Sequence, residues 1–242
     1  MCFSVTDFLR RFGHGLFVCC MAIVFSGCTT MRLPQRLNES QLSVETSGGF
    51  FSTMEYYFED WAVKEVTKEL YDKNRTEKKG RWISSHKVKI SYEYLFNLML
   101  KNEVKHRVEC FTRFDESGST VLGVQHSRDK TILKCGILNP VTGGVEGKID
   151  SIMEEEGMNG LTTFGENQFS IYSQYTAAAT SIFKPPSPYG YIIYRDSDAV
   201  AAIQLTHDRF IWIHPSVREE FGDHLAAVLM ALAYFVKLDP PI

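Results

Sequence analysis

Twelve consecutive apolar residues near the C-terminus, from Leu225 to Val236, constrain the fold of this chain more than any other feature. A helix that crosses a bilayer needs about 20 such residues, so this run is too short to span. It also lacks the polar stripe that a helix lying on a membrane or on one face of a sheet would show. Ser216 and Glu219 form a capping box at its start. The sequence therefore predicts a C-terminal helix over 216–238 that is surrounded by protein.

The segment between residues 85 and 214 has the alternating pattern of antiparallel strands. Every second residue from Val88 to Leu100 is apolar, and the alternation resumes from Val104 to Phe114. A period of two over such lengths is typical of half-buried strands. Further apolar runs separated by turn residues follow, ending in the strand "FIWIHP". A curved sheet of such strands has an apolar inner face that can enclose the C-terminal helix.

An amphipathic helix is predicted over residues 52–73, because Ser52 and Glu55 form a second capping box. The apolar residues recur there at three- and four-residue spacing: Met54, Tyr57, Phe58, Trp61, Val66 and Leu70. We expect this face to pack on the outside of the sheet. The alternative is that its aromatic residues dock a lipid or a partner.

The predicted fold class is therefore α+β and mostly antiparallel β. We expect a curved sheet or closed barrel around the buried C-terminal helix, with the 52–73 helix outside. The strands "YGYIIYRDSDAVAAIQL" and "FIWIHP", followed by "HLAAVLMALAYFVKLD", resemble the tubby C-terminal-like fold of phospholipid scramblases and LURP-one-related proteins. The resemblance covers roughly residues 85–238 and implies a closed barrel threaded by its last helix. The alternative is a half-open sheet with both helices on one face.

The N-terminus has the three zones of a secretory signal: Arg10 and Arg11, an apolar stretch, and small residues before Cys28. Ser26-Gly27-Cys28 resembles the lipobox of bacterial lipoproteins, which implies cleavage of residues 1–27 and lipidation of Cys28. Acyl chains contribute about 0.8 kcal/mol per buried CH₂, so they anchor a protein without a spanning helix. The alternative is an uncleaved N-terminal anchor.

Thr29 follows the cysteine, whereas Asp at that position favours inner-membrane retention in the lipoproteins that the chain resembles. The expected location is the periplasmic face of the outer membrane. Residues 28–48 are polar with few large apolar side chains, and we predict a flexible tether there. Residues 49–242 then form a single globular domain.

Only Cys110 and Cys135 remain after removal of the signal and lipidation of Cys28. Both alternate with inward-facing apolar neighbours in their predicted strands. In an oxidising compartment the two residues form a disulfide or remain buried thiols, and the sequence leaves both possibilities open.

Neither the charge nor the motifs indicate an activity. The net charge is −3, and removal of a signal with net charge +1 leaves −4, which argues against nucleic-acid binding. The chain has no Gly-rich phosphate loop, His-Glu-x-x-His, Cys-x-x-Cys or Gly-x-Ser-x-Gly motif. We predict no catalytic, metal-binding or cofactor-binding residue and no cofactor. The acidic run at 154–156 is expected to be a solvated loop.

Two functions remain as hypotheses. The first is a non-enzymatic lipoprotein, held on the membrane by the lipid on Cys28, that binds a lipid or a protein of the envelope. The second is a periplasmic hydrolase assembled from scattered His, Asp and Ser residues. It requires a concave site where at least two of these side chains meet. The hypothesis would lose its basis if four histidines were distant from one another and without carboxylate partners: His106, His207, His214 and His224.

Overall fold

The computed structural model describes residues 31–37, 41–47, 55–79, 83–121, 124–154, 157–175, 188–206 and 209–235. The predicted signal peptide (1–27) and the predicted lipidation site at Cys28 lie outside these residues. The described elements follow one another in the order η2 (Gln35–Leu37), β1 (Gln41–Ser43), β2 (Glu45–Ser47), β3 (Glu55–Phe58), β4 (Trp61–Lys79), β5 (Ile83–Leu100), β6 (Glu103–Val121), β7 (Val124–Leu138), β8 (Val145–Glu154), β9 (Gly157–Phe164), β10 (Asn167–Gln174), β11 (Gly190–Arg195), β12 (Asp198–Gln204), β13 (Phe210–Ile213) and α2 (Pro215–Tyr234).

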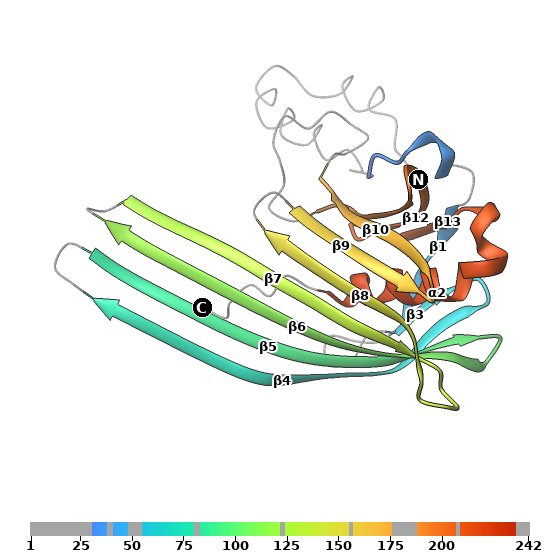
Figure 1. Ribbon diagram of the computed structural model, residues 1–242, viewed down its shortest axis with the longest axis horizontal. Coiled ribbons are helices and arrows are strands. Elements are labelled where there is room, and N and C mark those ends of the chain that lie inside the picture. Colours follow the sequence, from blue (N-terminus) through green and yellow to red (C-terminus); the bar gives the residue numbers. More distant parts are fainter. Residues whose placement is uncertain are drawn as a thin grey trace, which may run out of the picture.

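The thirteen strands form a single antiparallel sheet in which β2 to β12 each pair with the next strand in sequence (Figure 1). The sheet ends at β1, which pairs with β13, and at β2, which pairs with β3. In the chain, β1 and β2 are separated by a single residue, Val44. Its N–H donates to the carbonyl of Arg209 at 3.1 Å. Residues 41–47 therefore join the two ends of the sheet and make it a nearly closed barrel.

The interior of the barrel is filled by α2. All eight residues from Leu225 to Leu232 have no exposed surface, and the Tyr94 hydroxyl on β5 donates to the Ala231 carbonyl at 2.8 Å. The predicted burial of an apolar C-terminal helix within a curved sheet is thus confirmed. The helix begins one residue earlier than predicted: His214 is the N-cap and Pro215 occupies the first turn, where proline is tolerated. None of the described helices has both the length and the apolar character needed to cross a membrane.

The helix predicted over residues 52–73 is wrong, because its described part forms β3, the turn after it and the first 13 of the 19 residues of β4. Two irregularities explain the error. A turn with positive φ at Glu59 separates Phe58 from Trp61, and a bulge with positive φ at Glu65 separates Val63 from Val66. Each irregularity adds a residue to a period-two pattern and produces the three-residue spacing that is typical of a helix.

Residues 31–47, predicted as part of a tether over 28–48, belong to the fold in their described parts. Met31 and Leu37 are buried in a cluster with Trp212 and its neighbours on the outer face of β11, β12 and β13. The Met31 N–H donates to Gln204 Oε1 at 2.8 Å. Few apolar residues occur in this segment, but those that do occur are in contact with the sheet.

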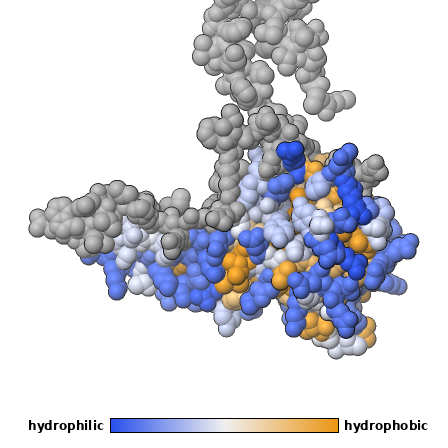
Figure 2. Space-filling model, turned by 45° about the horizontal axis from the view of Figure 1, so that its top comes forward, coloured by the Kyte–Doolittle hydropathy of each residue, from blue (hydrophilic) through white to orange (hydrophobic). Residues whose placement is uncertain are grey.

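Four strands are much longer than the rest. β4 to β7 have 15 to 19 residues, whereas β8 to β13 have 4 to 10. Their far halves, residues 70–79, 83–92, 112–121 and 124–131, project beyond the barrel as a four-stranded extension (Figure 1). Val88, Ile90 and Phe114 form a small buried cluster on its inner face. Its exposed surface in the left half of Figure 2 is mostly hydrophilic.

Candidate functional site

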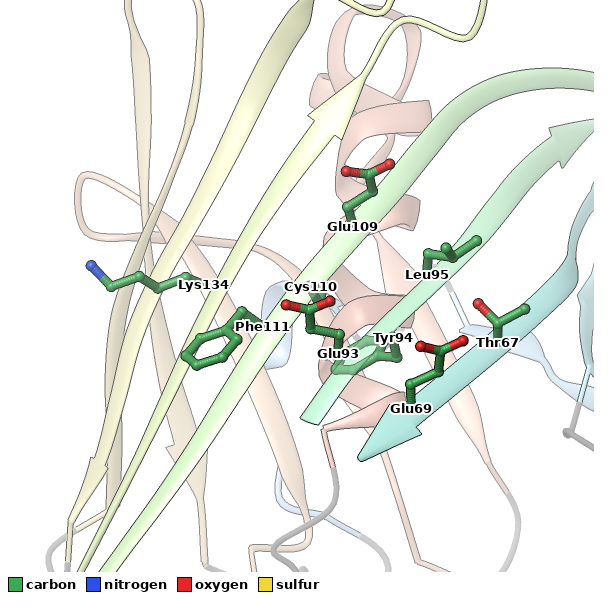
Figure 3. Close-up of a pocket in the computed structure, with 9 residues that line it drawn as sticks. All are labelled: Thr67, Glu69, Glu93, Tyr94, Leu95, Glu109, Cys110, Phe111 and Lys134. Atoms are coloured by element: carbon green, nitrogen blue, oxygen red, sulfur yellow. The ribbon is translucent and has the colours of Figure 1, made fainter. Parts of the chain in front are cut away.

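Because α2 fills the barrel, a binding site is expected on the outside. The outer face of β4 to β7 carries a groove of about 450 Å³ where the extension leaves the barrel (Figure 3). It is lined by Thr67, Glu69, Glu93, Tyr94, Leu95, Glu109, Cys110, Phe111 and Lys134. The groove includes part of the 52–73 segment.

The register of the sheet positions these side chains. Glu69 on β4 lies directly opposite Glu93 on β5, Glu93 lies opposite Phe111 on β6, and Phe111 lies opposite Lys134 on β7. Directly opposed residues of an antiparallel pair share one face of the sheet. The row of four residues therefore crosses all four strands on the face opposite to the buried Tyr94.

The β4 part of the groove lies between two register shifts, at Lys64/Thr67 and at Leu70/Asp72. Bulges of this kind bend a strand and change the direction of the next side chains. The bulge at Glu65 is held by a hydrogen bond of 2.6 Å from Asn97 Nδ2 to Glu65 Oε2. The two register shifts and this bond between β4 and β5 thus place Glu69 on the outer face.

The groove has an excess of negative charge. Glu109 pairs with Arg107 at 2.9 Å, and Lys134 pairs with Asp150 at 3.4 Å. In the part of the chain that the structure describes, neither Glu69 nor Glu93 has an ion-pair partner. Two like charges directly opposite each other destabilise a sheet, so this pair is electrostatically suited to a cation.

Beneath the groove, the structure joins Cys110 on β6 to Cys135 on β7 by a disulfide between directly opposed residues, with their Cα atoms 4.1 Å apart. Both residues belong to the barrel core. The bond links two of the strands that form the groove.

Of the histidines singled out in the sequence, the structure brings two together. His106 on β6 and His224 on α2 have ring centroids 4.4 Å apart, and Glu146 on β8 contacts His106. His214 is not part of this cluster and caps α2 instead. His207 lies outside the described residues, as do 155 and 156 of the acidic run, whereas Glu154 pairs with Lys130.

The sequence pattern could not have identified Glu69, Glu93 and Glu109 as one group. Glu93 and Glu109 do occupy the outward positions of the predicted strands, but Glu69 was assigned to a helix. Only the pairing of β4 with β5 brings it into the group.

Comparison with known proteins does not assign the chain to a family. No family model matches the chain, and it has no significant match among curated proteins or among solved structures.

Proposed function

We propose that this chain is a lipid-anchored protein of the periplasmic face of the outer membrane that acts as a non-enzymatic binding module. The lipobox ending at Cys28 supports this location. The filled barrel supports binding on the outside rather than in an internal cavity. The partner that we propose is a basic segment of another envelope protein.

One observation carries the proposed binding activity: Glu69 and Glu93 face each other across β4 and β5 without a cation of their own. Lysine or arginine side chains of a partner would relieve this repulsion, and charge complementarity gives specificity and fast association. Phe111 and Leu95 add apolar surface beside the carboxylates for the stems of such side chains.

The edge of β4 beside the groove can also bind an extended segment through its main chain. Among the described strands, β3 pairs with β4 only from Trp61 to Val63, so the rest of β4 has no neighbour on that side. An extended segment can add to such an edge through main-chain hydrogen bonds. From Thr67 to Lys79 the edge carries more basic than acidic residues, so a basic partner is attracted by the carboxylates of the groove and not by the edge itself. Charged residues are typical of natural edges that avoid indiscriminate pairing.

Titration with a ten-residue lysine-rich peptide tests this binding site. We expect the Glu69→Gln/Glu93→Gln double variant to bind at least about tenfold more weakly, and the wild-type affinity to fall with added salt. Glu166→Gln removes one exposed carboxylate in the β9–β10 turn and serves as the control. Equal binding by the double variant and the wild type would exclude the groove.

Lipid anchoring at Cys28 can be tested separately. Replacement of the thiol in Cys28→Ala should leave the protein soluble or as an uncleaved precursor, measured by membrane fractionation and by the mass of the N-terminal fragment. Unchanged outer-membrane fractionation of this variant would contradict lipid anchoring.

The second candidate function, a periplasmic hydrolase, is favoured by the meeting of His106 and His224 with Glu146. A nucleophilic site would also need a Ser, Thr or Cys side chain within reach of a histidine. Within the described residues, the hollow around this cluster is lined by none of these. Hydrolysis of ester and peptide reporter substrates by the purified protein, lost in His224→Gln, would favour the enzyme over the binding module.

A further inference from the structure

A second site lies at the end of the barrel that carries the β5–β6 and β7–β8 turns, far from the tips of the extension (Figure 1). His106 stands near the start of β6, Glu146 near the start of β8, and His224 in the middle of α2. Three separate elements, two from the barrel wall and one from its interior helix, thus each contribute one side chain. A hollow of about 280 Å³ adjoins them.

The geometry of the three side chains suits a metal ion. One ligand atom from each residue lies within 4.8 Å of the other two, and His106 Nδ1 is 3.2 Å from Glu146 Oε2. Ligands bound to one tetrahedral Zn²⁺ at about 2.0–2.2 Å are separated from one another by roughly 3.4 Å. Small side-chain rotations therefore bring all three atoms to a common centre.

The side chain of His106 provides independent evidence that this site binds a ligand. The residue is 5% exposed, and its Nδ1 is buried without a hydrogen bond, since the nearby Glu146 oxygen does not meet hydrogen-bond geometry. Buried polar atoms are almost always paired, so this nitrogen indicates a missing partner.

Neighbouring groups orient the carboxylate ligand. Asn139 Nδ2 donates to Glu146 Oε1 at 2.8 Å, which leaves Oε2 directed towards His106. Asn139 is itself fixed, because its Oδ1 accepts from the N–H groups of Val141 and Thr142. Partners of this kind are a regular feature of metal sites.

The charges around the hollow also favour a cation. Asp223 lines it with its carboxylate held by Trp61 Nε1 at 3.0 Å, and Glu219 and Glu220 add two more carboxylates. Lys105 and Arg218 are the basic residues of the lining, and Arg218 is already engaged by Glu59. With Glu146, the acidic residues outnumber the basic ones.

We propose that His106, Glu146 and His224 bind one divalent transition-metal ion, for which Zn²⁺ is the best match. Two imidazoles and one carboxylate suit Zn²⁺ and not Mg²⁺ or Ca²⁺, which prefer oxygen ligands alone. Three protein ligands leave a fourth position open towards the hollow. The site requires neither the lipid on Cys28 nor the groove on β4 to β7, and it gives the chain a second binding activity.

Calorimetric titration of the metal-free protein with ZnCl₂ tests the site. We expect one equivalent to bind, with a rise in Tm, and Co²⁺ to give the visible absorption of a tetrahedral complex. Glu146→Gln and His224→Gln should each weaken binding by at least about tenfold, since both residues are only partly buried and their loss leaves the core intact. MgCl₂ is expected to produce no saturable heat.

His86→Gln is the matched control, because His86 also lies beside a carboxylate, 3.1 Å from Glu116, but no third ligand joins this pair among the described residues. It should bind Zn²⁺ like the wild type. Circular dichroism shows whether each variant is folded, and Asn139→Ala provides a milder change that only releases Glu146. Stoichiometric binding that persists in both ligand variants, or no binding below about 100 μM, would overturn the proposal.

Discussion

At the scale of single residues, Gly190 shows how closely two parts of the backbone approach each other. Glycine at position 190 lies where the N-terminal segment, β11 and β12 meet. A Cβ atom there would lie 1.9 Å from the Ile203 carbonyl oxygen and 2.6 Å from Met31 Sδ. The backbones can approach this closely only because the residue has no side chain.

Gly190→Ala should therefore destabilise the protein by about 1–3 kcal/mol, the usual cost of an overpacked site. Gly136→Ala is the control, since a Cβ there would meet only the Leu138 side chain at 3.6 Å. Urea denaturation of both variants measures the difference. Equal stability of the two variants would contradict the tight contact.

For Glu69 we predict that a substitution increases the stability of the protein. Glu69→Gln removes the repulsion with Glu93 and should stabilise the protein by roughly 0.2–1 kcal/mol, the range measured for cross-strand pairs. The same change weakens binding in the groove, so stability and binding should move in opposite directions. Thermal unfolding at low salt gives the largest effect, and a destabilised variant would show that the pair is not under repulsion.

At the scale of elements, α2 contributes most to the core. Its residues from Leu225 to Leu232 are buried on all sides, so no position in this segment can hold a polar side chain without a partner. The helix contacts β5, β6, β7, β12 and β13, which are distributed around the barrel. Changes in the helix should therefore affect the whole molecule.

Leu229→Ala should cost about 2–5 kcal/mol, because it leaves a cavity in a region that cannot collapse easily. Leu229→Asp should prevent soluble folding. Glu219→Ala, at an exposed position of the same helix, should change the free energy of unfolding by no more than about 0.5 kcal/mol. If Leu229→Asp folded normally, α2 would not be the centre of the core.

The disulfide joins β6 and β7 beneath the groove and closes a loop of 25 residues. By loop entropy it stabilises the fold by roughly 3 kcal/mol. Cys110→Ala/Cys135→Ala should lower stability by up to this amount, while Cys28→Ala leaves the bond intact. Thiol labelling of the unfolded, unreduced protein counts the free cysteines, and two reactive thiols from Cys110 and Cys135 would show that they are not paired.

At the scale of the whole molecule, the protein consists of a solid barrel and a thinner extension of four of its strands. The β11 and β12 strands are buried almost throughout, whereas β4 is exposed from Thr67 to Lys79. Local stability follows buried apolar contacts. The two parts should therefore open with different free energies.

Amide hydrogen exchange tests this difference. Peptides covering residues 73–79 should exchange faster than peptides covering 191–193 and 199–203, which should require global unfolding. Uniform protection of both groups would show that the extension is as stable as the barrel. Adding Zn²⁺ should slow exchange around residues 104–108 and 221–226 and leave the extension unchanged, because only the barrel end contributes ligands.

The sequence by itself determined the buried helix and the inward faces of the long strands, since both follow from local periodicity. Val108, Cys110 and Leu133 face inward as their alternation requires. Tertiary structure alone decided whether the described part of residues 52–73 is strand or helix, because a turn at Glu59 and a bulge at Glu65 disguise a period of two. It also decided the closure of the barrel by residues 41–47 and both candidate sites. Glu69 meets Glu93 through strand register, and His106, Glu146 and His224 meet although they are far apart in sequence. Such contacts depend on how the elements pack, and a local pattern carries no information about that.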